Sequence, residues 1–139
     1  MNEVELLEIF TDGGARGNPG PAGIGVVFRV KGTTIASFKE YIGETTNNQA
    51  EYKAVLLALK HLKDFHYKAV NFYLDSLLVV NQVNGIYKVK NEELRPLYQQ
   101  IKDNLFFENV KFQYIPREKN QEADRLVNQA IDEHLKNQS

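Results

Sequence analysis

The fold is decided first by residues 4–41, VELLEIFTDGGARGNPGPAGIGVVFRVKGTTIASFKEY. Residues 4–11 are apolar and rich enough in β-branched side chains for a strand, and they run directly into the turn residues Asp12-Gly13-Gly14. After a Gly/Pro-rich stretch, residues 23–30 and 33–41 predict two further strands with a tight connection between them. The segment therefore predicts a three-stranded antiparallel meander.

The period of the apolar residues changes after the meander. From Thr46 onward, Ala50, Ala54, Ala58 and Leu62 recur at helical spacing, and Thr46 with Gln49 forms a possible capping box. The later elements are expected to be a strand over 70–74, helices over 77–83 and 92–104, a strand over 110–115 and a helix over 122–135.

The order βββαβααβα predicts an α/β protein. Its meander is antiparallel, and the two later strands, each followed by helical sequence, must join the sheet through crossovers. We therefore expect one mixed five-stranded sheet flanked by helices. A chain of 139 residues fits a single domain spanning residues 1–139.

Composition excludes several classes of protein. With 42% hydrophobic and 25% charged residues the chain is typical of a globular domain, and the lack of cysteine excludes disulfides, thiol nucleophiles and Cys-based metal sites. A net charge of −1 means that any nucleic-acid binding must use a local patch. No apolar run approaches the roughly 20 residues of a membrane span, and the acidic N-terminal sequence does not resemble a secretory signal. We expect a cytoplasmic protein with no membrane partner.

Four carboxylates are candidates for chemistry, although each has an ordinary structural explanation. Asp12 precedes Gly13-Gly14 and fits a turn, and Asp75 fits a helix N-cap. Glu51 and Asp124 fit the first turns of helices, where negative charge is favourable.

Taken together, the four acids predict a metal site. Asp12 and Asp75 end strands that lie side by side if the first and fourth strands are parallel, and Glu51 and Asp124 lie on helix faces turned toward the sheet. Clustered carboxylates repel one another by about 4 kcal/mol per close pair, so they need bound cations or raised pKa values. Oxygen ligands without histidine favour Mg²⁺ or Mn²⁺ over zinc.

The motifs that carry these acids resemble type 1 ribonuclease H. They are TDGGARGNPGPAG at 11–23, TTNNQAE at 45–51, DS at 75–76 and EADRL at 122–126, and the resemblance covers about residues 4–135. It implies a metal-dependent endonuclease that cuts the RNA strand of RNA/DNA hybrids and leaves 3′-hydroxyl and 5′-phosphate ends. The implied metal-binding and catalytic residues are Asp12, Glu51, Asp75 and Asp124, which would hold two Mg²⁺ or Mn²⁺ ions when substrate is bound.

The resemblance also implies substrate-binding residues. Asn18, Asn47 and Asn48 match minor-groove residues that sense the ribose 2′-hydroxyl, while Thr46 and Asn91 match residues that hold a DNA phosphate. Turn and cap roles are the structural alternatives for the asparagines.

Three departures from the family pattern alter these expectations. The basic helical protrusion of many bacterial members is reduced to a short connection with Lys88, Lys90 and Arg95, which predicts weaker and more salt-sensitive binding. The mobile histidine loop is replaced by REKN at 117–120, where Arg117 is either a stabiliser of phosphate charge or a solvated loop residue. Leu77 stands where a glutamine is common.

Two other functions remain open at this point. One is a non-catalytic module that binds RNA/DNA hybrids, although a polyanion-binding protein would be helped by losing the four acids. The other is a related nuclease that also cuts double-stranded RNA. In each case a monomer that acts on nucleic acid is expected.

Overall fold

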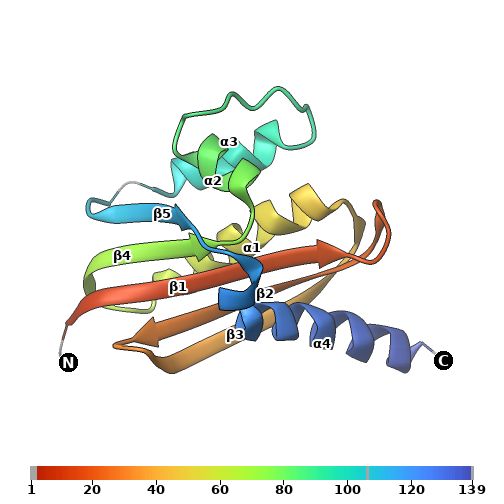
Figure 1. Ribbon diagram of the computed structural model, residues 1–139, viewed down its shortest axis with the longest axis horizontal. Helices are drawn as coiled ribbons and strands as arrows, with labels where there is room; N and C mark the ends of the chain where they lie inside the picture. The colour runs from red at the N-terminus through yellow and green to blue at the C-terminus, as the bar shows by residue number, and fades with distance from the viewer. Residues whose placement is uncertain (1–2, 106, 139) are drawn as a thin grey trace.

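A computed structural model of the chain describes residues 3–105 and 107–138, which form one five-stranded sheet covered by helices on both faces (Figure 1). The strand order is β3-β2-β1-β4-β5. The first three strands pair antiparallel, and β4 and β5 add in parallel beside β1. The strands are β1 (Val4–Ala15), β2 (Gly20–Val30), β3 (Thr33–Thr45), β4 (Tyr67–Leu74) and β5 (Val110–Tyr114). The expected mixed five-stranded α/β sheet is confirmed.

The helices divide between the two faces of the sheet. Side chains of α1, α2 and α3 share the main core with one face, whereas α4 packs on the other face over β2 and β3 (Figure 1). The helices are α1 (Asn47–Leu62), α2 (Leu77–Val83), α3 (Arg95–Asp103) and α4 (Gln121–Asn137), and a 3-10 turn, η1 (Arg117–Lys119), precedes α4. None of the helices in the described ranges is long and apolar enough to cross a bilayer.

Alternation along the central strands separates core from functional positions. Leu7 and Ile9 of β1 and Phe72 of β4 are fully buried under α1 and its neighbours. Successive strand residues point to opposite faces of the sheet. Asp12 therefore faces away from the side on which Leu7 and Ile9 are buried, and Asp75 faces away from the side of Phe72. The strand pattern thus places both aspartates on the α4 side of the sheet.

Several element boundaries differ from the sequence-based expectation. β1 does not end at Thr11 but continues to Ala15, because β2 pairs with it through Ala15↔Ala22. α3 begins at Arg95 rather than at residue 92, since the Asn91 side chain caps the backbone N–H groups of Glu93 and Leu94 in a preceding turn. These differences arise from pairing and capping partners that local hydrophobic periodicity does not record.

Two glycines allow the helices to approach the sheet backbone directly. A Cβ at Gly13 would lie 2.3 Å from the Ala50 carbonyl oxygen of α1, and one at Gly25 would lie 2.5 Å from the Ala123 carbonyl oxygen of α4. Real Cβ atoms are not tolerated at such distances. The glycines therefore set how closely Glu51 and Asp124 are brought to β1.

Candidate active site

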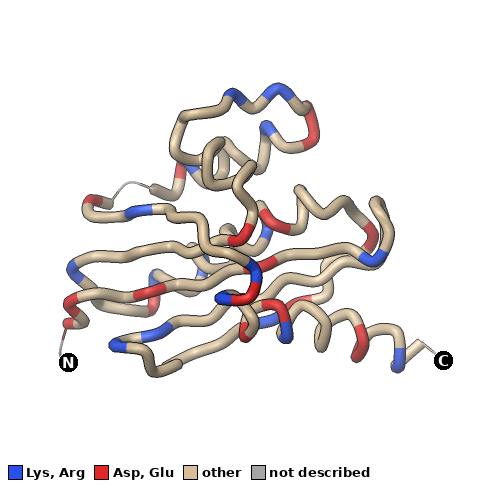
Figure 2. Tube along the Cα trace, in the orientation of Figure 1, with Lys and Arg blue, Asp and Glu red and all other residues tan. Residues whose placement is uncertain are grey.

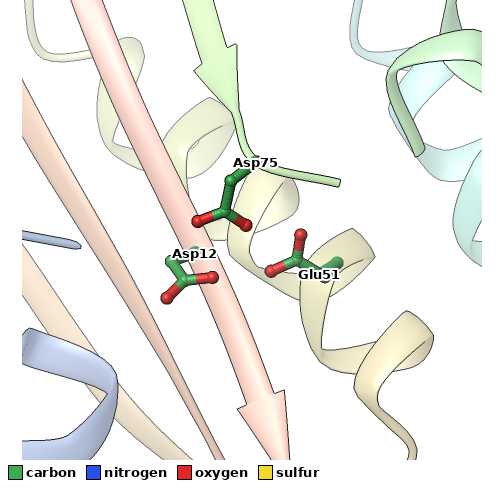
Figure 3. Close-up of side chains that lie close together, drawn as sticks. All are labelled: Asp12, Glu51 and Asp75. Atoms are coloured by element: carbon green, nitrogen blue, oxygen red, sulfur yellow. The ribbon is translucent and has the colours of Figure 1, made fainter. Parts of the chain in front are cut away.

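The parallel pairing of β1 and β4 brings two acids together at the edge of the sheet. The ladder ends with the pair Thr11↔Leu74, so Asp12 and Asp75 are the next residues on adjacent strands. Glu51 reaches them from α1, and the three carboxylates point toward one another (Figure 3). One carboxylate oxygen from each lies within 4.8 Å of the others.

The local fold fixes the orientation of Glu51. The backbone N–H of Gly13 donates a hydrogen bond of 2.5 Å to Glu51 Oε1. Glu51 and Asp12 are only 6% and 8% exposed, so they are largely withheld from solvent. A buried carboxylate is costly unless hydrogen bonds, protons or cations compensate its charge.

Burial and mutual repulsion are visible in the proton affinities of these acids. Burial raises the pKa of Asp12 from 3.8 to about 7, and the charges of Asp75 and Asp124 add to the effect, while a hydrogen bond with Glu51 opposes it. Burial raises the pKa of Glu51 well above its usual value, and the charge of Asp12 raises it further. Burial also raises the pKa of Asp75, against the lowering effects of a hydrogen bond from Asn120 and of the Arg117 charge.

The donor set fits hard divalent cations. All three clustered side chains offer carboxylate oxygens, the ligands preferred by Mg²⁺ and Mn²⁺. Burial raises the pKa of all three acids, and bound cations would favour their ionised forms. The residues therefore suit the ions expected from the sequence.

Asp124 lies at the rim of this cluster. Its carboxylate is not among the oxygens within 4.8 Å of one another, but it lines the same cleft as the other three acids. Arg117 Nη2 lies 3.6 Å from Asp124 Oδ1, and the Arg117 side chain is 79% exposed. The structure thus joins the four acids in one cleft: Asp12, Glu51 and Asp75 are mutually close, and Asp124 interacts with Asp12 and also pairs with Arg117.

The cleft has a volume of about 570 Å³ and a polar wall beside the acids. Asn47, Asn48 and Arg16 form part of that wall. The N–H of Asn47 donates to Asn18 Oδ1 at 3.0 Å, and Asn47 Oδ1 in turn accepts from the N–H of Ala15 at 2.7 Å. Of the three asparagines expected at the minor groove, Asn47 and Asn48 therefore line the cleft with the acids, and Asn18 lies behind them, bonded to Asn47.

The two residues expected at a DNA phosphate lie at neighbouring caps. Thr46 is the N-cap of α1, where Oγ1 accepts from the N–H of Gln49, and Asn91 caps the turn before α3. Gln49 Nε2 donates to Glu93 Oε2 at 2.6 Å and so links these two segments. The Gln49 side chain therefore bonds to Glu93. Among the described residues, no hydrogen bond runs from the Thr46 N–H to the Gln49 side chain, as a complete capping box would require.

Two further residues contribute to the site without a clear signal in the sequence. Arg16 lines the cleft and is held by Asp132 at 2.6 Å and Asn128 at 3.1 Å, both on α4. Asn120 is 1% exposed and donates to Asp75. Arg16 and Asn120 are each placed by partners more than forty positions away in the chain. Motif spacing, in contrast, predicts only the acids themselves.

The connection between α2 and α3 stands in place of a basic protrusion and carries charges of both signs. Figure 2 shows Lys/Arg as well as Asp/Glu positions along it. Leu77 is 52% exposed at the start of α2. His61 of α1 and His134 of α4 stack on Phe38 and Tyr41, so both histidines pack their helices against β3.

Known proteins share this arrangement. The reverse transcriptase-like family matches residues 10–130. An RNase H1 from compost, solved in complex with an RNA/DNA hybrid, is 47% identical, with a TM-score of 0.89 over 93% of this chain and 99% of its own. RNase H1 of the archaeon Halobacterium salinarum is 35% identical, with a TM-score of 0.88 over 92% of this chain and 98% of its own.

A bifunctional protein of Mycobacterium tuberculosis is 40% identical over 127 residues, which are 89% of this chain. The match spans 35% of the length of that relative. The family match covers most of the chain, and the archaeal and compost structures are matched over nearly their whole length. The chain therefore belongs to the reverse transcriptase-like family and, within it, to the type 1 ribonuclease H group.

Proposed function

We propose that the protein hydrolyses the RNA strand of RNA/DNA hybrids and leaves 3′-hydroxyl and 5′-phosphate ends. The observation that carries this proposal is the convergence of Asp12, Glu51 and Asp75 within 4.8 Å in a cleft that also contains Asp124. The compost RNase H1, which is similar along 93% of this chain, is described in complex with such a hybrid.

Asp12, Glu51, Asp75 and Asp124 are the residues that would hold divalent cations, two Mg²⁺ or Mn²⁺ ions when substrate is bound. Such ions supply activation of a water molecule for attack on phosphorus and stabilisation of the departing 3′ oxygen. The chain contributes the preorganised carboxylates, among them Glu51, whose Oε1 is held by the N–H of Gly13. No protein nucleophile is required, in keeping with the absence of cysteine.

Recognition of RNA is assigned to Asn18, Asn47 and Asn48. The side-chain oxygens of Asn18 and Asn47 accept bonds from the backbone, and no acceptor among the described residues takes their Nδ2 protons. These amide donors are available for the 2′-hydroxyl, which distinguishes RNA from DNA. These backbone bonds fix the Asn18 and Asn47 side chains, and Asn47 lines the cleft.

The DNA strand is assigned to the N-terminus of α1. Thr46 caps this helix, and a helix N-terminus favours a phosphate. The Gln49–Glu93 hydrogen bond holds the turn containing Asn91 against the same helix end. Thr46 at the start of α1 and Asn91 in the turn before α3 can therefore bind the same phosphate.

Arg117 is assigned to the charge of the scissile phosphate. Its guanidinium lies 3.6 Å from Asp124 and is largely exposed, so it can exchange this partner for substrate. Glu118 follows it in η1 and is the alternative group for the role of the missing histidine loop. A monomer suffices for the proposed chemistry because one chain supplies all four acids.

The proposal is tested by incubating the protein with labelled RNA/DNA hybrid, DNA duplex and RNA duplex, each with Mg²⁺, Mn²⁺ or EDTA. We expect metal-dependent cleavage of the RNA strand of the hybrid, and its loss in Asp12→Asn but not in Asp64→Asn, which alters an exposed aspartate beyond α1. Binding of the hybrid without cleavage would instead indicate a non-catalytic module. Equal cleavage of the RNA duplex would contradict hybrid specificity.

A further inference from the structure

Asn120 joins the two strand ends that carry the central aspartates. It lies between η1 and α4 and is 1% exposed. Its Nδ2 group donates to the carbonyl oxygen of Thr11 at 2.8 Å and to Asp75 Oδ2 at 3.2 Å. One buried side-chain amide therefore contacts both β1 and the residue after β4.

The position of this amide matters because the β1–β4 ladder ends there. Thr11↔Leu74 is its last pair, so beyond it backbone pairing between these strands does not hold Asp12 and Asp75 together. The backbone of Asn120 also accepts a hydrogen bond of 3.1 Å from the N–H of Asp124. The same residue thus supports the segments from which three of the four acids project.

The hydrogen bonds of Asn120 fix the orientation of its side-chain amide. The Thr11 carbonyl can only accept a hydrogen bond, so the Nδ2 end of the amide must face it and the neighbouring Asp75 Oδ2. This leaves Asn120 Oδ1 buried with no hydrogen-bond partner in the described part of the chain.

We propose that Asn120 is a positioning residue that holds the Asp75 carboxylate and the end of β1 in the arrangement that binds divalent cations. The inference rests on the proposed function, because it takes the acidic cluster to be a cation site. Without the amide bridge, the like charges of Asp12 and Asp75 favour their separation. Loss of a partner that orients a metal ligand typically lowers metal affinity by about 10- to 100-fold.

The inference is tested by isothermal titration of Mn²⁺ into the full chain without substrate. The variants are Asn120→Ala, which removes the amide, and Asn120→Asp, which keeps its shape but replaces the donor by an acceptor. The matched control is Asn84→Ala, because Asn84 Nδ2 also donates to a strand carbonyl, that of Phe112 at 3.1 Å, but the residue does not line the cleft.

We expect Mn²⁺ affinity to fall by at least about tenfold in both Asn120 variants and to remain within about twofold of wild type in Asn84→Ala. Folded Asn120 variants with wild-type affinity would overturn the positioning role and leave the proposed nuclease function standing. A wild-type protein without Mn²⁺ affinity would overturn the cation site itself.

A measurement on the wild-type protein covers the case in which the Asn120 variants do not fold. In amide-resolved NMR spectra, addition of Mg²⁺ is expected to shift the side-chain NH₂ signals of Asn120 and to leave those of Asn84 unchanged. Unchanged Asn120 signals at saturating Mg²⁺ would overturn the inference, because Asn120 donates directly to Asp75.

Discussion

Replacement of Asp12 by asparagine should make the metal-free protein more stable while abolishing cleavage. Asp12 is buried beside Glu51 and Asp75, so its ionised form is disfavoured in the folded chain. Asparagine has nearly the same shape and carries no charge. The substitution therefore removes a repulsive charge together with a cation ligand.

The magnitude follows from the change in proton affinity. The pKa of Asp12 is raised from 3.8 to about 7, and each pKa unit corresponds to about 1.4 kcal/mol, so full ionisation costs the folded state about 4 kcal/mol. Because this pKa is raised on folding, the penalty is absent below about pH 4 and grows as the pH rises toward about 7. Burial of the asparagine amide also costs free energy, so we expect a gain of about 2–4 kcal/mol at about pH 8.

The assay is thermal unfolding in EDTA, followed by far-ultraviolet circular dichroism because the chain has no tryptophan. At about pH 8, Asp12→Asn should raise Tm by roughly 6–12 °C. Near pH 4, the variant and the wild type should differ by less than about 1 kcal/mol in free energy of unfolding. The control Asp64→Asn should change Tm little at either pH. A Tm for Asp12→Asn that is unchanged or lowered at about pH 8, or raised equally at both pH values, would refute the reasoning from crowded charges.

Three further predictions test the loop, the helix contact and the basic connection. Arg117→Ala should lower kcat on the hybrid by about tenfold with little change in Kd, and a loss confined to Kd would reject a role in the reaction. Gly13→Ala should destabilise the fold by at least about 2 kcal/mol in urea unfolding, because its Cβ would lie 2.3 Å from the α1 backbone, whereas Gly14→Ala, with its nearest neighbour at 3.6 Å, should not. Replacing Lys88 and Lys90 by alanine should weaken hybrid binding and reduce the salt slope by about 1–2, and an unchanged slope would show that neither contacts phosphate.

Local patterns predicted the elements well where caps and periodicity agreed. The helix expected over 77–83 has those bounds, and its N-cap is Ser76 rather than Asp75, with Ser76 Oγ accepting from the N–H of Val79. The expected start of α3 at residue 92 was wrong because the turn capped by Asn91 delays the helix to Arg95. A side-chain cap of this kind competes with helix formation, and the apolar spacing of the segment does not reveal it.

In the candidate site, too, the sequence predicted some features and missed others. The motifs predicted the acids and the strand ends that carry two of them, and the parallel β1–β4 pairing brings Asp12 and Asp75 together as expected. The motifs did not indicate that Asp124 pairs with Arg117 at the rim or that Asn120 bridges the strand ends. These features depend on where η1 and α4 dock, which the sequence pattern does not record.

The sequence by itself determined the order of the elements, the family and the residue types available for chemistry, because periodicity, turn residues and motif spacing are properties of neighbouring positions. Only the tertiary structure decided which oxygens approach within 4.8 Å, how strongly burial perturbs them and which amide holds them there. Desolvation and charge repulsion depend on distances between side chains that are far apart in the chain, and these distances exist only once the helices have packed against the sheet.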